Sequence, residues 1–419
     1  MSSNLYLTPG WYQERRTWPS TSSILRSTTF CILLVGFSAW IISYRHFTVA
    51  SARDPTSYFF NPAKGYQRLY SLDREKEAYA YLKDYNHTNV SPPAAPEHPF
   101  ICAGIATIAR PSQEQYVRGA VGSLLQGLTD AQRQTIHLTT FVAHTDPTAH
   151  PIYREPWLKG VSNEVLTYDV PETELAQLRL FEEQHHPRNK SMYDYGYLLQ
   201  SCLRTGAKYV AILEDDVIAR DGWYKMATSS LQKIEAGMGT SPWLYLRMFY
   251  TEILLGWNGE EWLKYAITSL CLFTALLVIL HVSRTRSPLL KRHISNLDIW
   301  LLCGFYLPAF IILYFMAGRV TMQPPRAGVS LMPRFGCCSQ GFIFPRQIVP
   351  QVIERTKQAM DEDYYIDMLL ERYADKEKLR RYVHYPSLLQ HVGNKSSKGH
   401  GYDEHAGEIF NFGFEIKPP

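Results

Sequence analysis

The apolar run KYVAIL at residues 208–213 ends in three consecutive acids, Glu214, Asp215 and Asp216. Carboxylates crowded at the end of a buried segment repel one another, and a bound cation relieves that repulsion. Hard oxygen ligands of this kind suit Mn²⁺ or Mg²⁺, and an octahedral ion with open positions can bridge to a diphosphate and neutralise a leaving nucleoside diphosphate. A solvated turn after a strand is the alternative, and it would be preferred if the triplet stood alone.

Other chemistries lack their sequence patterns. The chain contains no CxxC pair, HExxH or GxSxG motif, so the commoner zinc and serine-hydrolase sites are not indicated. A net charge of +4, with no long basic run outside one short loop, argues against a nucleic-acid partner. The 419 residues, 46% of them hydrophobic and 20% charged, suffice for one large core together with membrane spans.

Alternating strand-like and helix-like segments surround the triplet and must position it. The expected strands are residues 100–108, 136–142, 164–168, 208–213 and 342–344, and the expected helices are residues 112–125, 191–204 and 361–372. A capping box of Ser112 and Gln115 predicts where the first of these helices begins. The alternation predicts an α/β fold with a mostly parallel sheet, whose ligands bind at the carboxyl ends of the strands, where the triplet lies.

Three apolar stretches are typical of membrane spans. Residues 28–44 carry no charge, follow several arginines and lack a small-residue cleavage site, which indicates a retained signal anchor. Residues 265–282 and 299–318 contain no Lys, Arg, Asp or Glu. Buried core helices are the alternative for one of these two stretches, but the polar loop between them makes that a poor explanation of both.

Basic residues set the expected orientation. The loop 283–296 holds Arg284, Arg286, Lys291 and Arg292. By the positive-inside rule this loop and the arginine-containing segment before residue 28 lie in the cytoplasm, and the rest of the chain lies in a lumen. Several N-x-S/T sequons agree with a luminal position, and we expect Asn86 to be glycosylated.

Three of the seven cysteines fall in the apolar stretches. The other cysteines, which an oxidising lumen would hold, are Cys102, Cys202, Cys337 and Cys338. An even number can pair fully, with a ring closed between the adjacent pair and a bond between the distant pair. Sequence does not fix this connectivity, and buried free thiols are the alternative.

Three segments carry a family resemblance: RNKSMYDYGYLL at 188–199, KYVAILEDDV at 208–217 and YPSLLQHVGNKSS at 385–397. Together they resemble the core of GT-A-fold transferases related to N-acetylglucosaminyltransferase IV. A signal anchor, an EDD motif, a transmembrane hairpin inside the catalytic domain and a Cys-Cys pair are closer to the post-GPI-attachment GalNAc transferases of the Golgi, including their fungal relatives. This second resemblance spans nearly the whole chain.

The resemblance implies a luminal GT-A domain interrupted by the hairpin. The expected parts are a cytoplasmic tail (1–27), the signal anchor (28–44), a luminal stem and linker (45–99), the first part of the GT-A domain (100–262), a transmembrane helix (263–282), a basic cytoplasmic loop (283–297), a transmembrane helix (298–318) and the second part of the GT-A domain (319–419). Within the stem, residues 73–84 are expected to form an amphipathic helix, solvated or packed in the stem.

Metal and donor sites follow from the same resemblance. In related enzymes the first acid of the motif faces the nucleotide, the middle acid lies near the donor sugar and the last binds the metal, which implies Asp216 as a metal ligand. His391 matches the late histidine that completes the metal or diphosphate site, and an ordinary surface histidine is the alternative. The remaining donor-binding residues implied are Thr107, Arg110, Lys190, Glu214, Asp215, Ser339, Gln340, Gly341 and Lys395. Ordinary strand and turn chemistry would also explain Gly341.

An inverting reaction needs a base, because the acceptor hydroxyl loses its proton as it attacks the anomeric carbon. The acidic segment at residues 361–365 resembles the motif that supplies this base, and it implies Glu362 or Asp363 as the catalytic residue. Stabilisation of a helix dipole is the alternative role of these acids.

The implied function is metal-dependent, inverting transfer of GalNAc or another HexNAc from a UDP-sugar to a mannose of the GPI-anchor glycan. The implied donor is UDP-GalNAc, with Mn²⁺ or Mg²⁺ as cofactor. Implied partners are GPI-anchored proteins and Golgi membrane lipid, since spans inside the catalytic domain raise the effective concentration of membrane-held acceptors. An N-glycan N-acetylglucosaminyltransferase and an inactive membrane lectin or escort are the alternatives; the complete set of Glu214, Asp216 and His391 argues against the last.

Overall fold

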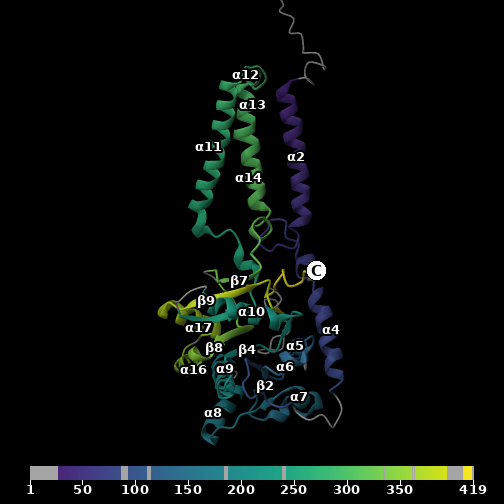
Figure 1. Cartoon of the computed structure of the whole chain (residues 1–419), viewed down its shortest axis with the longest axis vertical. Coiled ribbons are helices and arrows are strands. Elements are labelled where there is room, and N and C mark those ends of the chain that lie inside the picture. The colour runs from purple at the N-terminus through teal and green to yellow at the C-terminus, as the bar shows by residue number, and fades with distance from the viewer. Residues whose placement is uncertain are drawn as a thin grey trace, which may run out of the picture. The chain divides into compact units, whose positions relative to one another are not determined.

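The computed structural model describes residues 27–85, 93–110, 115–183, 187–237, 242–333, 336–360, 362, 364–393 and 409–417 (Figure 1). Among these residues, 27–50 and 258–317 form one compact unit, and 51–257 with 318–417 form another. The first unit contains the candidate membrane spans, and the second contains the sheet. Each unit is described below by itself.

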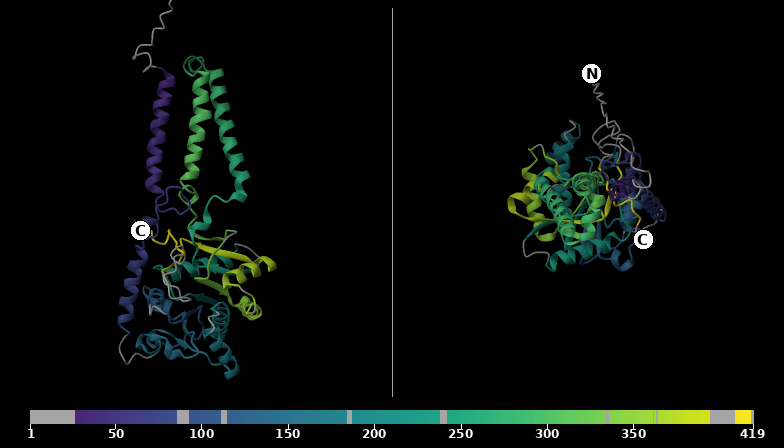
Figure 2. Two further views of the ribbon diagram at one scale, coloured as in Figure 1. Left: turned by 180° about the vertical axis from the view of Figure 1, so that it is seen from behind. Right: turned by 90° about the horizontal axis from the view of Figure 1, so that it is seen from above.

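Among the described residues, three helical runs are long and apolar enough to cross a membrane, so the chain is a membrane protein (Figures 1 and 2). The first run is α2 (Thr28–Ala50) and the second is α11 (Trp262–Arg286). The third run consists of α13 (Asn296–Trp300), the π-helical η5 (Leu301–Tyr306) and α14 (Leu307–Met316). In the chain, η4 (Gly259–Glu261) comes directly before α11, and α12 (Pro288–His293) lies between α11 and α13. Within this unit α2 approaches the third run closely, because Gly36 lies against the ring of Tyr306. The hydroxyl of that tyrosine donates to the carbonyl of Leu33 at 2.8 Å.

The second unit is built on a mixed eight-stranded sheet with the order β3-β2-β1-β4-β8-β6-β9-β7. Its strands are β1 (Ile101–Thr107), β2 (Ile136–Val142), β3 (Glu164–Leu166), β4 (Tyr209–Leu213), β6 (Trp243–Arg247), β7 (Gly328–Leu331), β8 (Gly341–Pro345) and β9 (Arg380–Tyr385). The strands β1 to β4 are parallel, β8 runs antiparallel to β4 and β6, β9 runs parallel to β6, and β7 runs antiparallel to β9. The expected α/β fold with a mostly parallel sheet is confirmed.

A small second sheet and the surrounding helices complete this unit (Figure 1). The sheet pairs β5 (Val217–Ala219) antiparallel with β10 (Leu389–His391). The helices are α3 (Pro62–Gly65), α4 (Tyr70–Lys83), α5 (Val117–Leu125), α6 (Asp130–Arg133), α7 (Pro156–Val161), α8 (Glu172–Glu183), α9 (Pro187–Arg204), α10 (Trp223–Glu235), α15 (Arg319–Met322), α16 (Val349–Gln358) and α17 (Ile366–Glu377), with short 3₁₀ turns η1 (Pro147–Ala149), η2 (Pro151–Arg154), η3 (Glu252–Leu255) and η6 (Arg346–Ile348).

The strand that leads into the acidic triplet is buried on both faces. Ala211 and Leu213 of β4 belong to a core with α5 and α10, whereas Val210 and Ile212 belong to a second core with α9, α16 and α17. Successive side chains of a strand point to opposite faces, so a strand covered on both sides reads as a continuous apolar run. This explains why the sequence shows KYVAIL rather than an alternating pattern.

Several element boundaries differ from the sequence prediction. The helix expected from residue 112 begins at Val117, and Ser112 of the predicted capping box lies outside the described residues. The helix α9 begins at Pro187, ahead of the expected residue 191, since proline is favoured in a first helical turn. The helix expected from residue 361 begins only at Ile366, so Glu362 is not in a first helical turn.

The helix expected in the stem belongs to the globular unit. It is α4 (Tyr70–Lys83), which begins before the expected residue 73, and Gly122 of α5 packs directly on the backbone of Ala78 in α4. Arg74 is buried and donates to the carbonyls of Ala219 at 3.2 Å and Ser123 at 3.1 Å. This helix therefore joins α5 and β5 rather than standing in solvent.

Candidate functional site

The acidic triplet connects β4 of the large sheet to β5 of the small sheet. Antiparallel pairing of β5 with β10 places Val217 opposite His391, and the amide of Val392 donates to the carbonyl of Asp216 at 2.9 Å. As a result Nε2 of His391 lies 3.5 Å from Oδ2 of Asp216. The two residues that the resemblance implied as metal ligands are thus brought together from positions far apart in the sequence.

The middle acid, Asp215, is fully engaged by protein groups. Arg110 donates from Nη1 to Oδ2 at 2.8 Å and from Nη2 to Oδ1 at 2.6 Å, and Thr107 donates from its hydroxyl to Oδ2 at 2.6 Å. The guanidinium of Arg110 also lies over the ring of Tyr116, at 4.7 Å from its centroid. Arg110 and Thr107 therefore fix Asp215 in the site, and the donor contact implied for both residues stays a prediction.

A histidine that the sequence analysis did not select supports Thr107. Nε2 of His150 lies 3.0 Å from the hydroxyl of Thr107, and Nδ1 accepts from the amide of Ile152 at 3.3 Å. Burial lowers the pKa of His150 to about 4, so the ring is neutral and carries its proton on Nε2. The order of donation is therefore from His150 to Thr107 and from Thr107 to Asp215.

The first acid, Glu214, is held by the segment that precedes β8. Ser339 donates a short hydrogen bond from its hydroxyl to Oε1 of Glu214, and the amide of Glu214 donates to the carbonyl of Gln340 at 3.1 Å. Burial raises the pKa of Glu214 to about 7, and the charge of Asp216 adds to the rise. Ser339 and Gln340, two of the residues predicted to bind the donor, thus contact the triplet directly.

Asp216 has the properties of a cation ligand. Burial by itself would raise the pKa of its carboxyl, but His391 and Arg110 outweigh burial and hold that pKa below its usual range. Its Oδ1 is buried and has no hydrogen-bond partner among the described residues. A buried carboxylate that has one unpartnered oxygen, Oδ1, and an imidazole nitrogen 3.5 Å from its other oxygen, Oδ2, fits a divalent cation such as Mn²⁺ or Mg²⁺.

His391 is oriented toward this position. Its side chain is buried, and Nδ1 lies 3.0 Å from the carbonyl oxygen of Ile409. A carbonyl only accepts, so Nδ1 carries a proton and Nε2 is the nitrogen directed at Asp216. The Asp216 carboxylate outweighs burial and raises the pKa of His391. The alternative of an ordinary surface histidine does not describe this side chain.

Lys190 lies at the end of β2, in a different cluster. Its ammonium donates to the carbonyl of Ala143 at 2.8 Å and to Oδ2 of Asp194 at 3.0 Å, and Glu182 lies 3.5 Å away. In the described part of the chain these partners compensate the charge of Lys190. The donor contact implied for this residue stays a prediction.

Gly341 is required for packing. A Cβ at this position would lie 2.5 Å from Cδ1 of Leu389 and 3.3 Å from Cβ of Met248. The glycine therefore lets β8 pass close to β10, and the donor contact implied for Gly341 stays a prediction. The neighbouring Gln340 is buried, and its Oε1 has no partner among the described residues.

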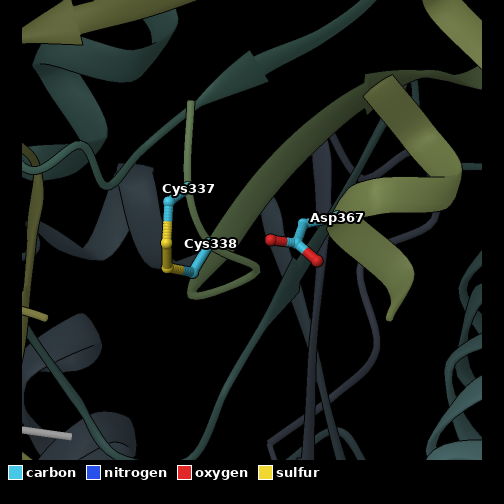
Figure 3. Close-up of side chains that lie close together, drawn as sticks. All are labelled: Cys337, Cys338 and Asp367. Carbon is cyan, nitrogen blue, oxygen red and sulfur yellow. A yellow bond between two sulfur atoms is a disulfide. The ribbon is translucent and has the colours of Figure 1, made fainter. Parts of the chain in front are cut away.

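Of the two acids predicted as the base, only Glu362 lies among the described residues. Glu362 is exposed in a bend before α17, and Asp363 lies outside the described residues, as do Lys395 and Asn86. The first turn of α17 instead carries Asp367, whose carboxylate faces the adjacent cysteines of the loop before Ser339 (Figure 3). Sequence analysis missed Asp367 because it expected the helix to begin five residues earlier.

Both cysteine pairs are disulfide-bonded. Cys102 of β1 is joined to Cys202 of α9 with a Cα–Cα distance of 5.5 Å, and Cys337 is joined to Cys338. The sulfurs of the adjacent pair lie within 4.8 Å of a carboxylate oxygen of Asp367. Because these sulfurs are bonded to each other, they are not available as thiolate ligands, and the group is not a metal site.

Comparison with known families shows the family of this chain. Residues 101–390 match a family model described as GPI-N-acetylgalactosamine transferase PGAP4. The chain belongs to this family. The match covers both halves of the sheet and the helices inserted between them, so the chain is a glycosyltransferase of the GPI-GalNAc transferase type, as the sequence resemblance suggested. No individual curated protein matches the chain.

Proposed function

We propose that this chain is a Golgi enzyme that transfers GalNAc from UDP-GalNAc to a mannose of the GPI glycan, with inversion at the anomeric carbon. A divalent cation, Mn²⁺ or Mg²⁺, would be held by Asp216 and His391. The observation that carries the proposal is the Asp216 carboxylate at the end of β4. Its Oδ1 is buried without a partner among the described residues, and its Oδ2 lies 3.5 Å from Nε2 of His391. Family membership supports the sugar and the class of acceptor.

In the proposed reaction, the residues of the site have separate roles. When bound, the cation supplies positive charge that stabilises the departing diphosphate. Arg110 compensates the charge of Asp215 through two hydrogen bonds, so Asp216 is the acid of the pair that would hold the cation. Glu214, held by Ser339, would accept a hydrogen bond from the nucleotide side of the donor.

Transfer also requires removal of one proton. The acceptor hydroxyl oxygen forms a bond to the anomeric carbon as the bond to the diphosphate breaks, UDP departs, and the hydroxyl proton passes to a base. We propose Asp367 for this role, because it faces the disulfide loop that continues into Ser339 and thereby into Glu214. Glu362 and Asp363 remain the sequence-based candidates.

Connections to the candidate spans support a membrane-held acceptor. Within the sheet-containing unit, Oδ2 of Asp54 accepts from the amide of Thr321 at 2.7 Å, and Arg319 donates to the carbonyl of Gly256 at 3.2 Å. The chain segments that follow α2, precede α11 and follow α14 are therefore bonded to one another. We propose that this tether keeps the transferase unit in the membrane of its acceptor, raising the effective acceptor concentration.

A donor panel with the full-length protein in detergent tests the proposal. Mn²⁺, a GPI-anchored protein acceptor and a series of UDP-sugars are combined with wild type, Asp216→Ala and Asp169→Ala, an exposed acid outside the site. We expect transfer from UDP-GalNAc by wild type and Asp169→Ala, and its loss in Asp216→Ala. Preferential use of another sugar, transfer to N-glycans, or full activity of Asp216→Ala would each overturn the corresponding part of the proposal.

A further inference from the structure

The segment at residues 409–417 lies beyond the part of the chain that matches the family model, which ends at residue 390. It contains no helix or strand, yet residues 410–415 are buried, with Asn411 and Phe414 at 0% exposure. A buried segment without regular structure must satisfy its backbone groups through specific partners. The identity of those partners shows what the segment does.

One partner is the candidate metal ligand itself. The carbonyl of Ile409 accepts from Nδ1 of His391 at 3.0 Å. A hydrogen bond to the second ring nitrogen fixes the tautomer and the ring orientation of a metal-binding histidine, and its loss typically lowers metal affinity about 10- to 100-fold. Ile409 therefore determines which nitrogen of His391 faces Asp216.

The same segment also binds the residue before His391. Oε1 of Gln390 accepts from the amide of Asn411 at 2.9 Å, and Nε2 of Gln390 donates to the carbonyl of Asn411 at 2.8 Å. Adjacent side chains of a strand point to opposite faces, so the segment contacts both faces of β10. His391 is thereby restrained in its backbone as well as in its ring.

Glu415 ties this arrangement to α4. Its Oε1 accepts from Nε2 of Gln390 at 2.7 Å, and its Oε2 accepts from the amides of Leu69 at 2.7 Å and Ser71 at 3.1 Å. These amides lie at the start of α4, where a carboxylate is favoured by unpaired N–H groups and by the helix dipole. Residues 409–417, yellow in Figures 1 and 2, lie beside this end of α4.

The middle of the segment is anchored near the residues that precede the hairpin. Glu252 accepts from the amides of Phe412 and Gly413, both at 2.8 Å. On the other side, Arg220 donates from Nη2 to the carbonyls of Gly413 at 3.1 Å and Phe414 at 2.8 Å. The segment is thus fixed by a carboxylate and a guanidinium that no step of the proposed reaction uses.

We propose that residues 409–415 form a C-terminal clamp that completes the active site by holding His391 in its metal-binding orientation, with Glu415 and Asn411 as positioning residues. This inference rests on the proposed metal-dependent function. The side chain of Glu415 acts through Gln390, and the side chain of Asn411 holds the segment through Tyr250 and Phe414. Their removal therefore changes how well the site binds a cation.

The test compares Glu415→Gln with the matched control Ile416→Ala in the full-length protein. The amide of glutamine has the size of the carboxylate but turns one acceptor oxygen into a donor. That donor faces other donors, either the amides of Leu69 and Ser71 or Nε2 of Gln390. The control residue, Ile416, is 67% exposed and lies outside the clamp. Mn²⁺ binding is measured by electron paramagnetic resonance of the free ion, beside kcat and KM for donor. We expect the Mn²⁺ Kd to rise about 10-fold in Glu415→Gln and not in Ile416→Ala.

Measuring kcat at saturating Mn²⁺ separates a loss of His391 positioning from a general destabilisation of the protein. If the clamp positions His391, high Mn²⁺ restores most of the kcat of Glu415→Gln, because mass action compensates for a weakened ligand. An unchanged Mn²⁺ Kd in folded Glu415→Gln would overturn the clamp, whereas absence of Mn²⁺ binding by wild type would overturn the proposed function instead. Should Glu415→Gln not fold, the Mn²⁺ Kd of Asn411→Ser decides whether the clamp holds His391. This change removes the side-chain bonds to the carbonyl of Tyr250 and the amide of Phe414, and it leaves Gln390 paired with the backbone of residue 411. A raised Kd supports the clamp and an unchanged Kd overturns it.

Discussion

Replacing Arg110 with methionine removes both charged hydrogen bonds from Asp215 while keeping an apolar side chain of similar length. The two side chains are only 4% and 8% exposed, so the remaining carboxylate cannot be rehydrated. Breaking one side of a buried ion pair costs about 3–5 kcal/mol. The bond from Thr107 at 2.6 Å persists and limits the loss, so we expect the free energy of unfolding to fall by about 3 kcal/mol.

The pH dependence of this loss gives a second readout. Burial already raises the pKa of Asp215, and removal of the opposing Arg110 charge raises that pKa further. A carboxyl whose folded pKa exceeds its unfolded value stabilises the fold at low pH and loses that contribution as pH rises through the folded pKa. The defect of Arg110→Met is therefore expected to be smaller at pH 5 than at pH 8.

Denaturant unfolding of the full-length protein in detergent, followed by tryptophan fluorescence, measures the loss. Adding Asp215→Asn to Arg110→Met should recover more than half of it, because a neutral amide no longer needs a cation. Arg118→Met is the matched control: its ion pair with Glu155 is 35% and 23% exposed, so we expect a loss below about 1 kcal/mol. A loss below about 1 kcal/mol in Arg110→Met, or no recovery in the double variant, would refute the reasoning.

Two further predictions concern the metal ligand and the clamp. In Gly393→Ala the new Cβ would overlap Oδ2 of Asp216, so we expect the Mn²⁺ Kd to rise at least about 10-fold with the thermal midpoint nearly unchanged; equal Kd values would contradict the placement of Gly393. Burial raises the pKa of Glu252 to about 7, so its stabilisation is complete below its unfolded pKa and is lost as pH rises through about 7. Hydrogen exchange at Phe412 and Gly413, corrected for intrinsic rates, should accelerate between pH 5 and pH 8, and pH-independent protection would contradict this.

The elements of the fold that could be predicted are those with a clear pattern of apolar residues. The strand β4 was predicted because both of its faces are covered, which leaves no polar position between Tyr209 and Leu213. The start of α17 at Ile366 was not predicted, because acidic residues at 361–363 look like a first helical turn in sequence alone. The pattern of apolar residues thus predicts which helices and strands are present better than it predicts where they begin and end.

The candidate site was predictable in composition but not in its division of roles. The approach of His391 to Asp216 was expected from the resemblance, and the structure places them 3.5 Å apart. The pairing of Arg110 with Asp215 depends on how two distant strands are juxtaposed, which local sequence does not encode. His150 was missed for the same reason, since its only signal is a tertiary contact with Thr107.

The clamp was not predicted from the sequence. Apolar and polar residues alternate from Phe410 to Lys417, which by pattern alone indicates a strand. The structure forms no strand there, and the order of the segment comes from side chains elsewhere, such as Glu252 and Arg220. Its burial could only be read from the folded chain.

Calorimetric titration of Mn²⁺ into the full-length protein with UDP present tests the central claim most directly. The account predicts one Mn²⁺ per chain for wild type and its loss in Asp216→Asn. That change removes the charge of a carboxylate whose Oδ1 has no partner among the described residues and whose Oδ2 lies 3.5 Å from His391. Equal Mn²⁺ binding by wild type and Asp216→Asn would contradict the assignment of the cation to the end of β4.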